Sequence, residues 1–543
     1  MPPHRKGCNP SFYELSSPQP VNISMQEKIT TFFKRWASMM NPPVFIGAGG
    51  TVILFILFGG IWTETATRTF ESVLQFITNR LGWYYVLIVS GFLVFTIWLF
   101  FSPHGKIRLG APDTKPEFSR WAWFTMLFAA GMGMGLIFWG VAEPIKHYNA
   151  PPFGEGGTQE AITTAMRYSF FHWGMHPWAI YIIFGLGIAY FHYRHGLPLA
   201  PRSLLYPMLG ERIHGVIGHA ADVISTVGTL LGVATSLGLG AMQINSGLEE
   251  LVEVGYGAES QILIIGIITL VATTSTITGV GKGIKYLSMT NIFLLFALLA
   301  FAFLAGPTQY QIELFITSLG SYLQHLIEMS LWIEPNTDNG WQSEWTLFYW
   351  GWWVSWCPFV GIFVARISKG RTLREFVGTL LILPPLVTFF WFAVFGGTAL
   401  QVEHFGEGGL TSVIDENVAM SLNALLGHLP FPMISRWASL LLITIFFITS
   451  SDSGSLVDDI VTSGGHPDPP VAQRAFWGIS EGAAAMVLVL TGGLSALQTA
   501  AISGGLLQSL LVIVSCISLV VALRRDTRAE GVPEQDAITV RED

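Results

Sequence analysis

Long apolar runs, separated by short polar or Pro/Gly-rich breaks, dominate the chain from residue 44 to residue 523. Each run is about 20 residues long, which is the length that an α-helix needs to cross roughly 30 Å of hydrocarbon. The pattern therefore predicts an all-α polytopic membrane protein with twelve transmembrane helices. Their predicted ranges are 44–62, 83–102, 121–145, 169–192, 221–248, 261–279, 286–306, 345–367, 373–398, 433–456, 472–492 and 502–523.

One segment between these runs has a different pattern. In residues 309–333, apolar side chains recur at helical spacing among polar ones, which predicts an amphipathic helix in the outer membrane interface. Two spans and then five precede it, and five follow, a count that indicates an inverted repeat after two added helices. The predicted divisions are an N-terminal segment 1–43, two peripheral helices 44–102, a first repeat 121–306, a connector 307–344, a second repeat 345–523 and a tail 524–543.

Composition and net charge exclude several classes of protein. Hydrophobic residues make up 51% of the 543 residues and charged residues 12%, about half of the roughly 25% charge typical of soluble proteins. A water-soluble fold is therefore excluded. The net charge is −8 and no long basic block is present, so a nucleic-acid partner is excluded as well.

Lys and Arg residues are unevenly distributed between the predicted loops. With the N-terminus inside, 23 of the 28 fall on the inner side, so both termini are expected in the cytoplasm. Residues 1–40 lack the apolar core of a signal peptide, so the first span is expected to act as the targeting signal. Cys8, Cys357 and Cys516 lie far apart in the sequence, which favours free thiols over a disulfide framework or a zinc site.

The third predicted span contains three alternating glycines, in the segment Ala129-Ala-Gly-Met-Gly-Met-Gly135, which we call the glycine motif. Each glycine weakens a helix by about 1 kcal/mol relative to Ala, so the motif predicts a break in mid-membrane. Unwound backbone at that depth persists only where it lines a cavity or lies inside protein, and its freed carbonyls and amides can hold ions. The alternative is a groove of small residues that lets two helices pack closely.

The eighth predicted span has five tryptophans in residues 345–356, more than an interfacial belt requires. Trp353 and Trp356 share one helical face, and in the fourth span Trp178 and Tyr181 share another. Such rings can form a cage for a quaternary ammonium, which each ring face holds by about 2 kcal/mol when desolvated. The alternative is that the rings only fill space between helices and anchor the interface.

Few polar residues within the spans have recognisable chemistry. His172 and His176 are the nearest candidates for a proton relay, although most helix-end histidines are simply hydrogen-bonded. Thr449 and Ser450 offer oxygen ligands for an alkali cation, and the alternative is a hydrogen bond to a carbonyl one turn back. The sequence shows no metal-ligand cluster, activated Ser or Cys, or paired carboxylates, so no enzyme activity is expected.

From about residue 40 to about residue 523, the chain resembles the betaine/choline/carnitine transporter family, and its tryptophan-rich segment is the most specific match. The matching segments are Gly131-Met-Gly-Met-Gly135, Phe171 to Tyr181, Trp345 to Arg371 and Phe446 to Ser453. The resemblance implies a glycine-betaine-type sodium symporter in the bacterial cytoplasmic membrane. It also implies an inverted five-helix repeat, two added N-terminal helices and a homotrimer.

The resemblance further implies three groups of binding residues. The substrate ammonium is expected among Trp173, Trp178, Tyr181 and Trp353, with Trp356 as a neighbouring contact. The substrate carboxylate is expected near the backbone of Met132, Gly133, Met134 and Gly135 and the hydroxyl of Ser236. Sodium is expected at the carbonyls of Ala129, Met132 and Phe446 and the hydroxyls of Thr449 and Ser450.

Two departures from the family pattern affect the expected function. A second sodium site in sodium-coupled members uses two threonines and a phenylalanine, and the matching residues are Thr229, Val233 and Phe359, so one hydroxyl is missing. Transport with one sodium per substrate therefore stays open. Choline-preferring relatives tend to carry Asp where this chain has Gly135, so a zwitterion such as glycine betaine is expected over choline.

The expected function is sodium-coupled import of a quaternary-ammonium zwitterion by alternating access, with sodium as coupling ion and no other cofactor. The alternative is proton-coupled or sodium-independent uptake or exchange of choline, carnitine or dimethylsulfoniopropionate. A cage of rings accepts any compact onium group, so the sequence leaves the individual substrate open.

Overall fold

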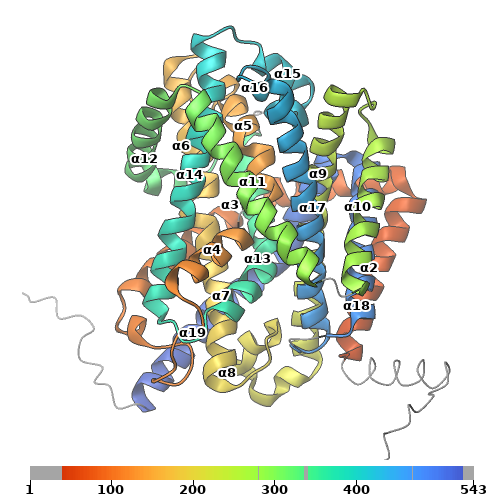
Figure 1. Cartoon of the computed structure of the whole chain (residues 1–543). Coiled ribbons are helices and arrows are strands. Elements are labelled where there is room, and N and C mark those ends of the chain that lie inside the picture. Colours follow the sequence, from red (N-terminus) through yellow and green to blue (C-terminus); the bar gives the residue numbers. More distant parts are fainter. Residues whose placement is uncertain (1–39, 132, 279–280, 335–339, 467–468, 530–543) are drawn as a thin grey trace, which may run out of the picture.

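The computed structural model describes residues 40–529 apart from 132, 279–280, 335–339 and 467–468 (Figure 1). This part of the chain is helical, apart from its loops and one isolated β-bridge between Arg108 and Thr372. The helices of the first half are α2 (Pro42–Ile61), α3 (Thr63–Phe101), α4 (Arg120–Gly131), α5 (Met134–Asn149), α6 (Gln159–Trp173), α7 (Met175–His195), α8 (Tyr206–Leu209), α9 (Val216–Val252), α10 (Ala258–Thr278) and α11 (Gly281–Ala305). The remaining helices are α12 (Thr308–Leu331), α13 (Phe348–Ile367), α14 (Leu373–Phe405), α15 (Leu410–Glu416), α16 (Ser421–Gly427), α17 (Pro432–Thr462), α18 (Val471–Gly492) and α19 (Leu494–Ala529).

Eleven helical segments in the described residues are long and apolar enough to cross a membrane. The third predicted span is divided into α4, of 12 residues, and α5, of 16 residues, and each is too short to cross alone. These two helices occupy the range of the remaining predicted span, 121–145. The polytopic all-α fold class is therefore confirmed.

The helices of the two halves repeat the same packing partners. α5 packs against α14 as α7 packs against α13, and α11 packs against α17 as α19 packs against α9. In the same way, α10 contacts α17 and α18 contacts α9. With the five crossings predicted for each half, an odd number, the second half would enter the membrane from the other side. The repeated contacts support the inverted repeat that the span count predicts.

Several helices extend beyond the predicted apolar ranges. α3 begins at Thr63 rather than at 83, α6 begins at Gln159 with Thr158 as its N-cap, and α17 ends at Thr462 rather than at 456. The apolar pattern marks only the part of a helix that lies in hydrocarbon. Polar residues outside that layer continue the same backbone hydrogen bonds, so the polar flanks are helical too.

A helix, α12, lies where the amphipathic helix is predicted, and its position in the outer interface stays a prediction. It buries Leu314 and Tyr322 against the bundle, whereas Ile316 and Leu323 are exposed. Figure 1 shows α12, α15 and α16 near one end of the molecule, with the start of α2 and the end of α19 at the other.

Large side chains are distributed as expected for a bundle surrounded by lipid. The outer surfaces of α2, α3 and α11 expose apolar residues such as Leu54, Phe101 and Phe293. Many of the largest fully buried side chains are aromatic, including Trp350, Trp352 and others of α5, α6, α7 and α13. The densest packing of rings therefore lies inside the bundle.

Candidate functional site

The third span is interrupted within the glycine motif. α4 ends at Gly131, and α5 begins at Met134 after Gly133, whose backbone is extended with φ −113° and ψ −160°. The predicted break is therefore confirmed. The interruption frees the last carbonyls of α4 and the first amides of α5 from partners in their own helices. Met132 lies outside the described residues, and Ala129 is described only by its place in the last turn of α4.

The glycines at the break let tryptophan rings approach the backbone. A β-carbon added at Gly135 would lie 2.5 Å from Cη2 of Trp352 and 3.0 Å from Cη2 of Trp173. One added at Gly133 would lie 3.2 Å from Cη2 of Trp356. The close approach is thus made by rings of α6 and α13, whereas the packing-groove alternative requires the backbone of a neighbouring helix.

The rings of α6, α7 and α13 are in contact beside this break. Trp173 meets Trp353 edge to face, with ring centroids 4.8 Å apart, and Tyr181 meets Trp353 at 6.5 Å. Trp178 contacts Tyr181 at 5.6 Å. None of these rings is more than 5% exposed, so they face the interior rather than lipid. With two neighbours from α13 they form the ring cluster, which consists of Trp173, Trp178, Tyr181, Tyr349, Trp352 and Trp353.

The fourth predicted span is also divided, at Gly174, which separates α6 from α7. A β-carbon there would lie 2.5 Å from the carbonyl oxygen of Phe170 and 2.8 Å from the hydroxyl of Tyr322, so this turn requires glycine. The Nε1 of Trp353 donates a hydrogen bond of 2.9 Å to the carbonyl oxygen of His172 in the last turn of α6. The ring cluster therefore satisfies a helix-end carbonyl that the division leaves free.

Ser236 lies on the face of α9 that is turned toward the break. Gly232 and Gly240 are four residues before and after it, so the three share one helical face. Atoms of Trp356 lie within 2.6 Å of a β-carbon added at Gly232, and atoms of Met134 within 2.8 Å of one added at Gly240. Ser236 is 2% exposed and sits between these two contacts. The structure thus brings the predicted carboxylate contacts Gly133, Met134, Gly135 and Ser236 into one region.

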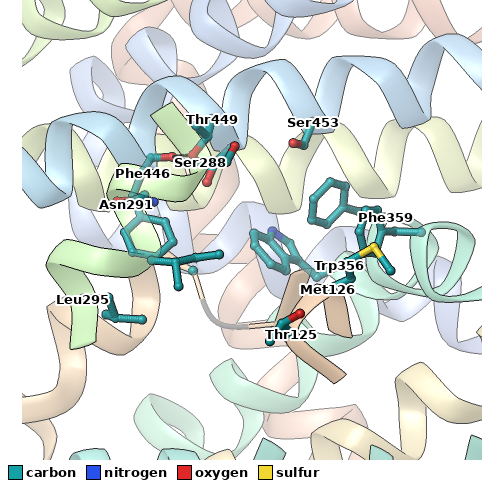
Figure 2. Close-up of a pocket in the computed structure, with 14 residues that line it drawn as sticks. Thr125, Met126, Ser288, Asn291, Leu295, Trp356, Phe359, Phe446, Thr449 and Ser453 are labelled. Atoms are coloured by element: carbon teal, nitrogen blue, oxygen red, sulfur yellow. Dashed lines mark hydrogen bonds between the residues drawn. The ribbon is translucent and has the colours of Figure 1, made fainter. Parts of the chain in front are cut away.

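A cavity of about 320 Å³ adjoins the break at Gly133. Figure 2 shows the side chains that face it from α4, α11, α13 and α17. Trp356 and Phe359 are part of its wall, but the members of the ring cluster are not. We call it the α17 cavity, after the helix that supplies three of its five hydroxyl groups, and its lining from α17 consists of Phe446, Thr449, Ser450 and Ser453.

The predicted sodium ligands of α17 therefore share this cavity with the broken backbone of the third span. The Thr449 hydroxyl donates to the carbonyl oxygens of Ile445 and Phe446, at 3.0 and 3.2 Å. This is the one-turn-back bond considered as the alternative, yet it uses only the hydrogen of the hydroxyl and leaves its oxygen lone pairs available. The hydroxyl can make the backbone bond and still coordinate a cation.

The second predicted sodium site is less complete. The Thr229 hydroxyl is buried and has no hydrogen-bond partner among the described residues, which suits an oxygen that coordinates an ion. Phe359 lines the α17 cavity. Val233 is buried and supplies no oxygen, so the site keeps one of its two hydroxyls.

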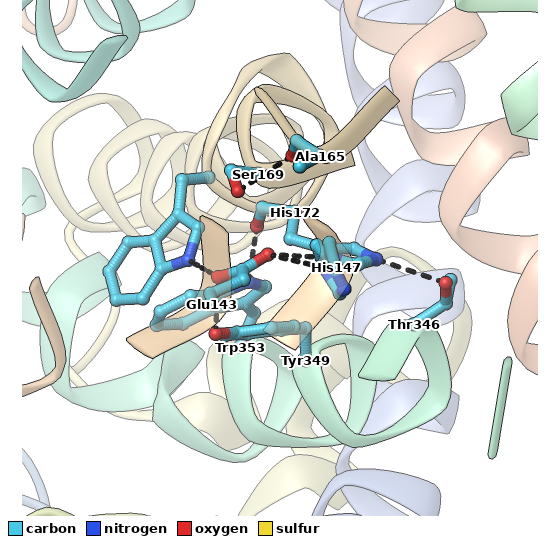
Figure 3. Close-up of polar contacts among 9 residues, drawn as sticks. Glu143, His147, Ala165, Ser169, His172, Thr346, Tyr349 and Trp353 are labelled. Atoms are coloured by element: carbon cyan, nitrogen blue, oxygen red, sulfur yellow. Dashed lines mark hydrogen bonds and ion pairs between the residues drawn. The ribbon is translucent and has the colours of Figure 1, made fainter. Parts of the chain in front are cut away.

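The buried carboxylate of Glu143 contacts the ring cluster. Figure 3 shows Glu143 of α5 between two histidines and two aromatic donors. Its Oε1 is 2.7 Å from Nδ1 of His172 and 3.2 Å from Nε2 of His147, and its Oε2 accepts from Trp173 and Tyr349. His176, the other histidine considered from the sequence, forms a hydrogen bond of 3.0 Å between its Nε2 and the hydroxyl of Ser330. The reading of His172 and His176 as hydrogen-bonded residues is therefore confirmed.

Sequence reasoning missed several buried residues. Asp458, Asp459 and Glu481 have no exposed surface, and none of the described residues forms a hydrogen bond with their carboxylates. The expectation of no paired carboxylates was wrong, because α17 continues past 456 and carries two of the three inside the protein. Tyr349 was also missed, although its spacing of four residues from Trp353 places both on one helical face.

Comparison with known proteins gives a family match over most of the chain. A family model described as BCCT, betaine/carnitine/choline family transporter, matches residues 43–528. The glycine betaine transporter OpuD of Bacillus subtilis is 44% identical over 87% of this chain and 92% of its own length. The glycine betaine transporter of Acinetobacter baylyi is 40% identical over 91% of this chain and 75% of its own length. The osmo-independent choline transporter BetT1 of the same organism is 38% identical over 90% and 94%.

Proposed function

Because the chain belongs to the betaine/carnitine/choline family of transporters, and is therefore not an enzyme, we propose that it imports a quaternary-ammonium zwitterion such as glycine betaine together with sodium. One observation carries the proposal. At a single break in the third span, the ring cluster lies beside Gly135 and the α17 cavity beside Gly133. Relatives that are named glycine betaine transporters support the substrate class.

The two ends of such a zwitterion suit the two features near Gly135. The ammonium carries methyl groups and no N–H, so it binds to the negative faces of aromatic rings, which the ring cluster supplies. The carboxylate suits the first amides of α5, because the N-terminus of a helix carries free N–H groups and partial positive charge. Ser236 adds a hydroxyl on the neighbouring face of α9.

Sodium would bind on the other side of the same break. The C-terminal end of α4 carries partial negative charge and free carbonyls, and Thr449 and Ser450 face it across the α17 cavity. An ion that holds these two helices together also fixes the backbone from which the substrate carboxylate is bound. Sodium then favours the substrate-binding conformation by its own differential affinity, which is the physical basis of coupling in alternating access.

The expected preference for a zwitterion over choline rests on Gly135. An Asp side chain at this position would begin with a β-carbon 2.5 Å from Trp352, so the present ring packing leaves no room for the negative charge that would complement choline. The similarity to a named choline transporter keeps uptake of choline, driven by protons or without sodium, as the second candidate.

The proposal includes the cellular setting. We place the chain in the bacterial cytoplasmic membrane, as a homotrimer with both termini in the cytoplasm. A thiol reagent that cannot cross membranes is expected to label Cys8 only after permeabilisation of cells, since Cys357 is buried and Cys516 partly buried. Cross-linking of purified protein is expected to give a species of three subunits. Labelling of Cys8 in intact cells would contradict a cytoplasmic N-terminus. Cross-linking that stops at two subunits would contradict the homotrimer.

The deciding experiment measures uptake into proteoliposomes that contain the purified full chain. Labelled glycine betaine is presented under an inward sodium gradient, with the proton gradient collapsed by an ionophore. We expect accumulation that stops when potassium replaces sodium. Uptake that follows an imposed proton gradient and ignores sodium would replace this function by the second candidate, and absence of uptake for glycine betaine, choline and carnitine alike would reject both.

A further inference from the structure

The carboxylate of Glu143 contacts two members of the ring cluster. Oε2 accepts hydrogen bonds from Nε1 of Trp173 at 2.8 Å and from the hydroxyl of Tyr349 at 2.6 Å. Both donors belong to the ring cluster. The carboxylate has no exposed surface, so these contacts lie in a region that water does not screen.

The histidines complete a set of four donors around this carboxylate. Nδ1 of His147 has no partner among the described residues, so its proton is assigned to Nε2, which faces Oε1 at 3.2 Å. With the hydroxyl of Thr346 assigned as the donor to Nε2 of His172, 3.0 Å away, Nδ1–H of the same ring donates to Oε1 at 2.7 Å. Each carboxylate oxygen thus accepts two hydrogen bonds, the arrangement that suits an ionised carboxylate.

No Lys or Arg of the described residues forms an ion pair with Glu143, and with this proton assignment its four partners are neutral. A buried charge without a counter-ion is costly unless another charge approaches it. The ring cluster lies on the side of Trp173 and Tyr349, between Glu143 and the break. A cation held by those rings would therefore supply the missing opposite charge.

The hydrogen bond to Trp173 also acts on the ring itself. An indole N–H that donates to a carboxylate is polarised, and hydrogen-bonded groups in a low-dielectric interior polarise one another. The added electron density makes the ring face more negative, and that face is what holds an onium cation. The ring of Trp173 lies 4.8 Å, centroid to centroid, from that of Trp353, so the polarised ring belongs to the interior of the ring cluster.

A metal ion is a weaker explanation for the same three side chains. Carboxylate and imidazole atoms of Glu143, His147 and His172 lie within 4.8 Å of one another, so the group has metal-ligand chemistry. However, the contact of 2.7 Å between Oε1 and Nδ1 of His172 is a hydrogen-bond distance. Two ligands that each lie about 2.0–2.1 Å from a tetrahedral ion are held farther apart than this.

We propose that Glu143 is a specificity-determining residue whose buried charge, acting through Trp173 and Tyr349, makes the ring cluster select a cationic headgroup over a neutral one of the same shape. This inference rests on the proposed function. It differs from a purely structural role, in which loss of the carboxylate would loosen the rings and weaken every ligand equally.

The test compares glycine betaine with 3,3-dimethylbutanoate, which has the same shape and carboxylate but a neutral carbon in place of the nitrogen. Both are measured as competitors of labelled glycine betaine uptake in proteoliposomes under a sodium gradient. Glu143→Gln is expected to weaken the binding of glycine betaine about tenfold and to change the binding of the carbon analogue less than twofold. Equal losses for both ligands, or unchanged selectivity, would overturn the inference.

Controls separate this result from misfolding and from failure of the proposed function. Glu403→Gln removes a carboxylate that accepts from the amides of Leu410 and Thr411, away from the ring cluster, and is expected to leave selectivity unchanged. Trp173→Phe keeps a ring and the carboxylate but removes the N–H link, so it is expected to lower the same selectivity even if Glu143→Gln does not fold. If added zinc raised uptake by the wild type, the interpretation of Glu143, His147 and His172 as a hydrogen-bonded group would be overturned. If the wild type takes up no onium compound, the proposed function fails first.

Discussion

The two sides of the glycine break differ in both chemistry and packing. On the side of Gly135, aromatic rings touch one another and fill the space. On the side of Gly133, the α17 cavity of about 320 Å³ is lined by hydroxyls of α17 as well as by apolar side chains. Rings favour a large, soft cation, whereas hydroxyl and carbonyl oxygens favour a small, hard one. The break is the short stretch of backbone that both sides share.

This comparison shows why the break, rather than either pocket alone, is the central feature. The aromatic side holds its shape through ring contacts and through hydrogen bonds such as that from Trp353 to the His172 carbonyl. The hydroxyl side instead lies between α17 and α4, and under the proposed function a sodium ion would hold these two helices together. Under the proposed function, the two ligands would share the backbone at the glycine break. The predictions below test each side separately.

The largest effect is expected at Gly135, where the first turn of α5 meets the rings of α6 and α13. Gly135→Ala places a methyl group 2.5 Å from Trp352 and 3.0 Å from Trp173, so the rings must shift. Overpacking of this kind costs about 1–3 kcal/mol, and we expect uptake of the labelled zwitterion to fall about 100-fold at the upper end of that range. Gly91→Ala is the matched control, because nothing lies within 4 Å of its added methyl group. Normal uptake by Gly135→Ala would show that ring position at the break is not critical.

A smaller but still large effect is expected on the aromatic side alone. Trp353→Ala removes one ring face, worth about 2 kcal/mol, and should raise the KM for the zwitterion about 30-fold while leaving the sodium concentration for half-maximal uptake nearly unchanged. Trp437→Ala, an exposed tryptophan on the outer surface of α17, serves as the control. Equal shifts in substrate and sodium dependence would mean that the two sides are not separable in this way.

On the hydroxyl side, Ser450→Ala should give the reverse pattern. Loss of one oxygen contact to a charged group costs about 1.5 kcal/mol, so we expect about ten times more sodium for half-maximal uptake. The KM for substrate at saturating sodium should change less than threefold. Ser412→Ala, in the exposed helix α15, is the control. A change in substrate KM without a change in sodium dependence would contradict the assignment of Ser450 to the ion.

The difference between the two sides also explains what the sequence could reveal. Tryptophans three residues apart, such as Trp353 and Trp356, share a helical face whatever the tertiary structure, so the aromatic side was visible as a pattern. The glycine motif predicted the break for the same local reason. In the structure, however, Trp356 lines the α17 cavity, whereas Trp353 belongs to the ring cluster.

Contacts between distant segments were not predictable from a single sequence. The sequence alone assigns no role to Glu143, because its partners on α6 and α13 are brought to it by packing. Helix limits failed for a related reason, since the polar end of α17 is inside the protein and hydropathy treats it as a loop. The division of the fourth span at Gly174 depends on Tyr322 of α12, more than 140 positions away in sequence.

The smallest expected change concerns the second sodium site on the hydroxyl side, at Val233, where the family pattern has a second hydroxyl. Val and Thr have nearly the same shape. Thr229 lies one helical turn before Val233, and its buried hydroxyl has no hydrogen-bond partner among the described residues. Val233→Thr is therefore expected to leave the substrate KM within twofold but to make uptake depend more steeply on sodium, with a Hill coefficient that rises from about 1 toward 2. The measurement is initial uptake against sodium concentration, with Val89→Thr in the peripheral helix α3 as control. A wild type that already shows second-order dependence would mean that Thr229 and Phe359 hold a second ion without this hydroxyl, and the hydroxyl side would then bind two ions rather than one.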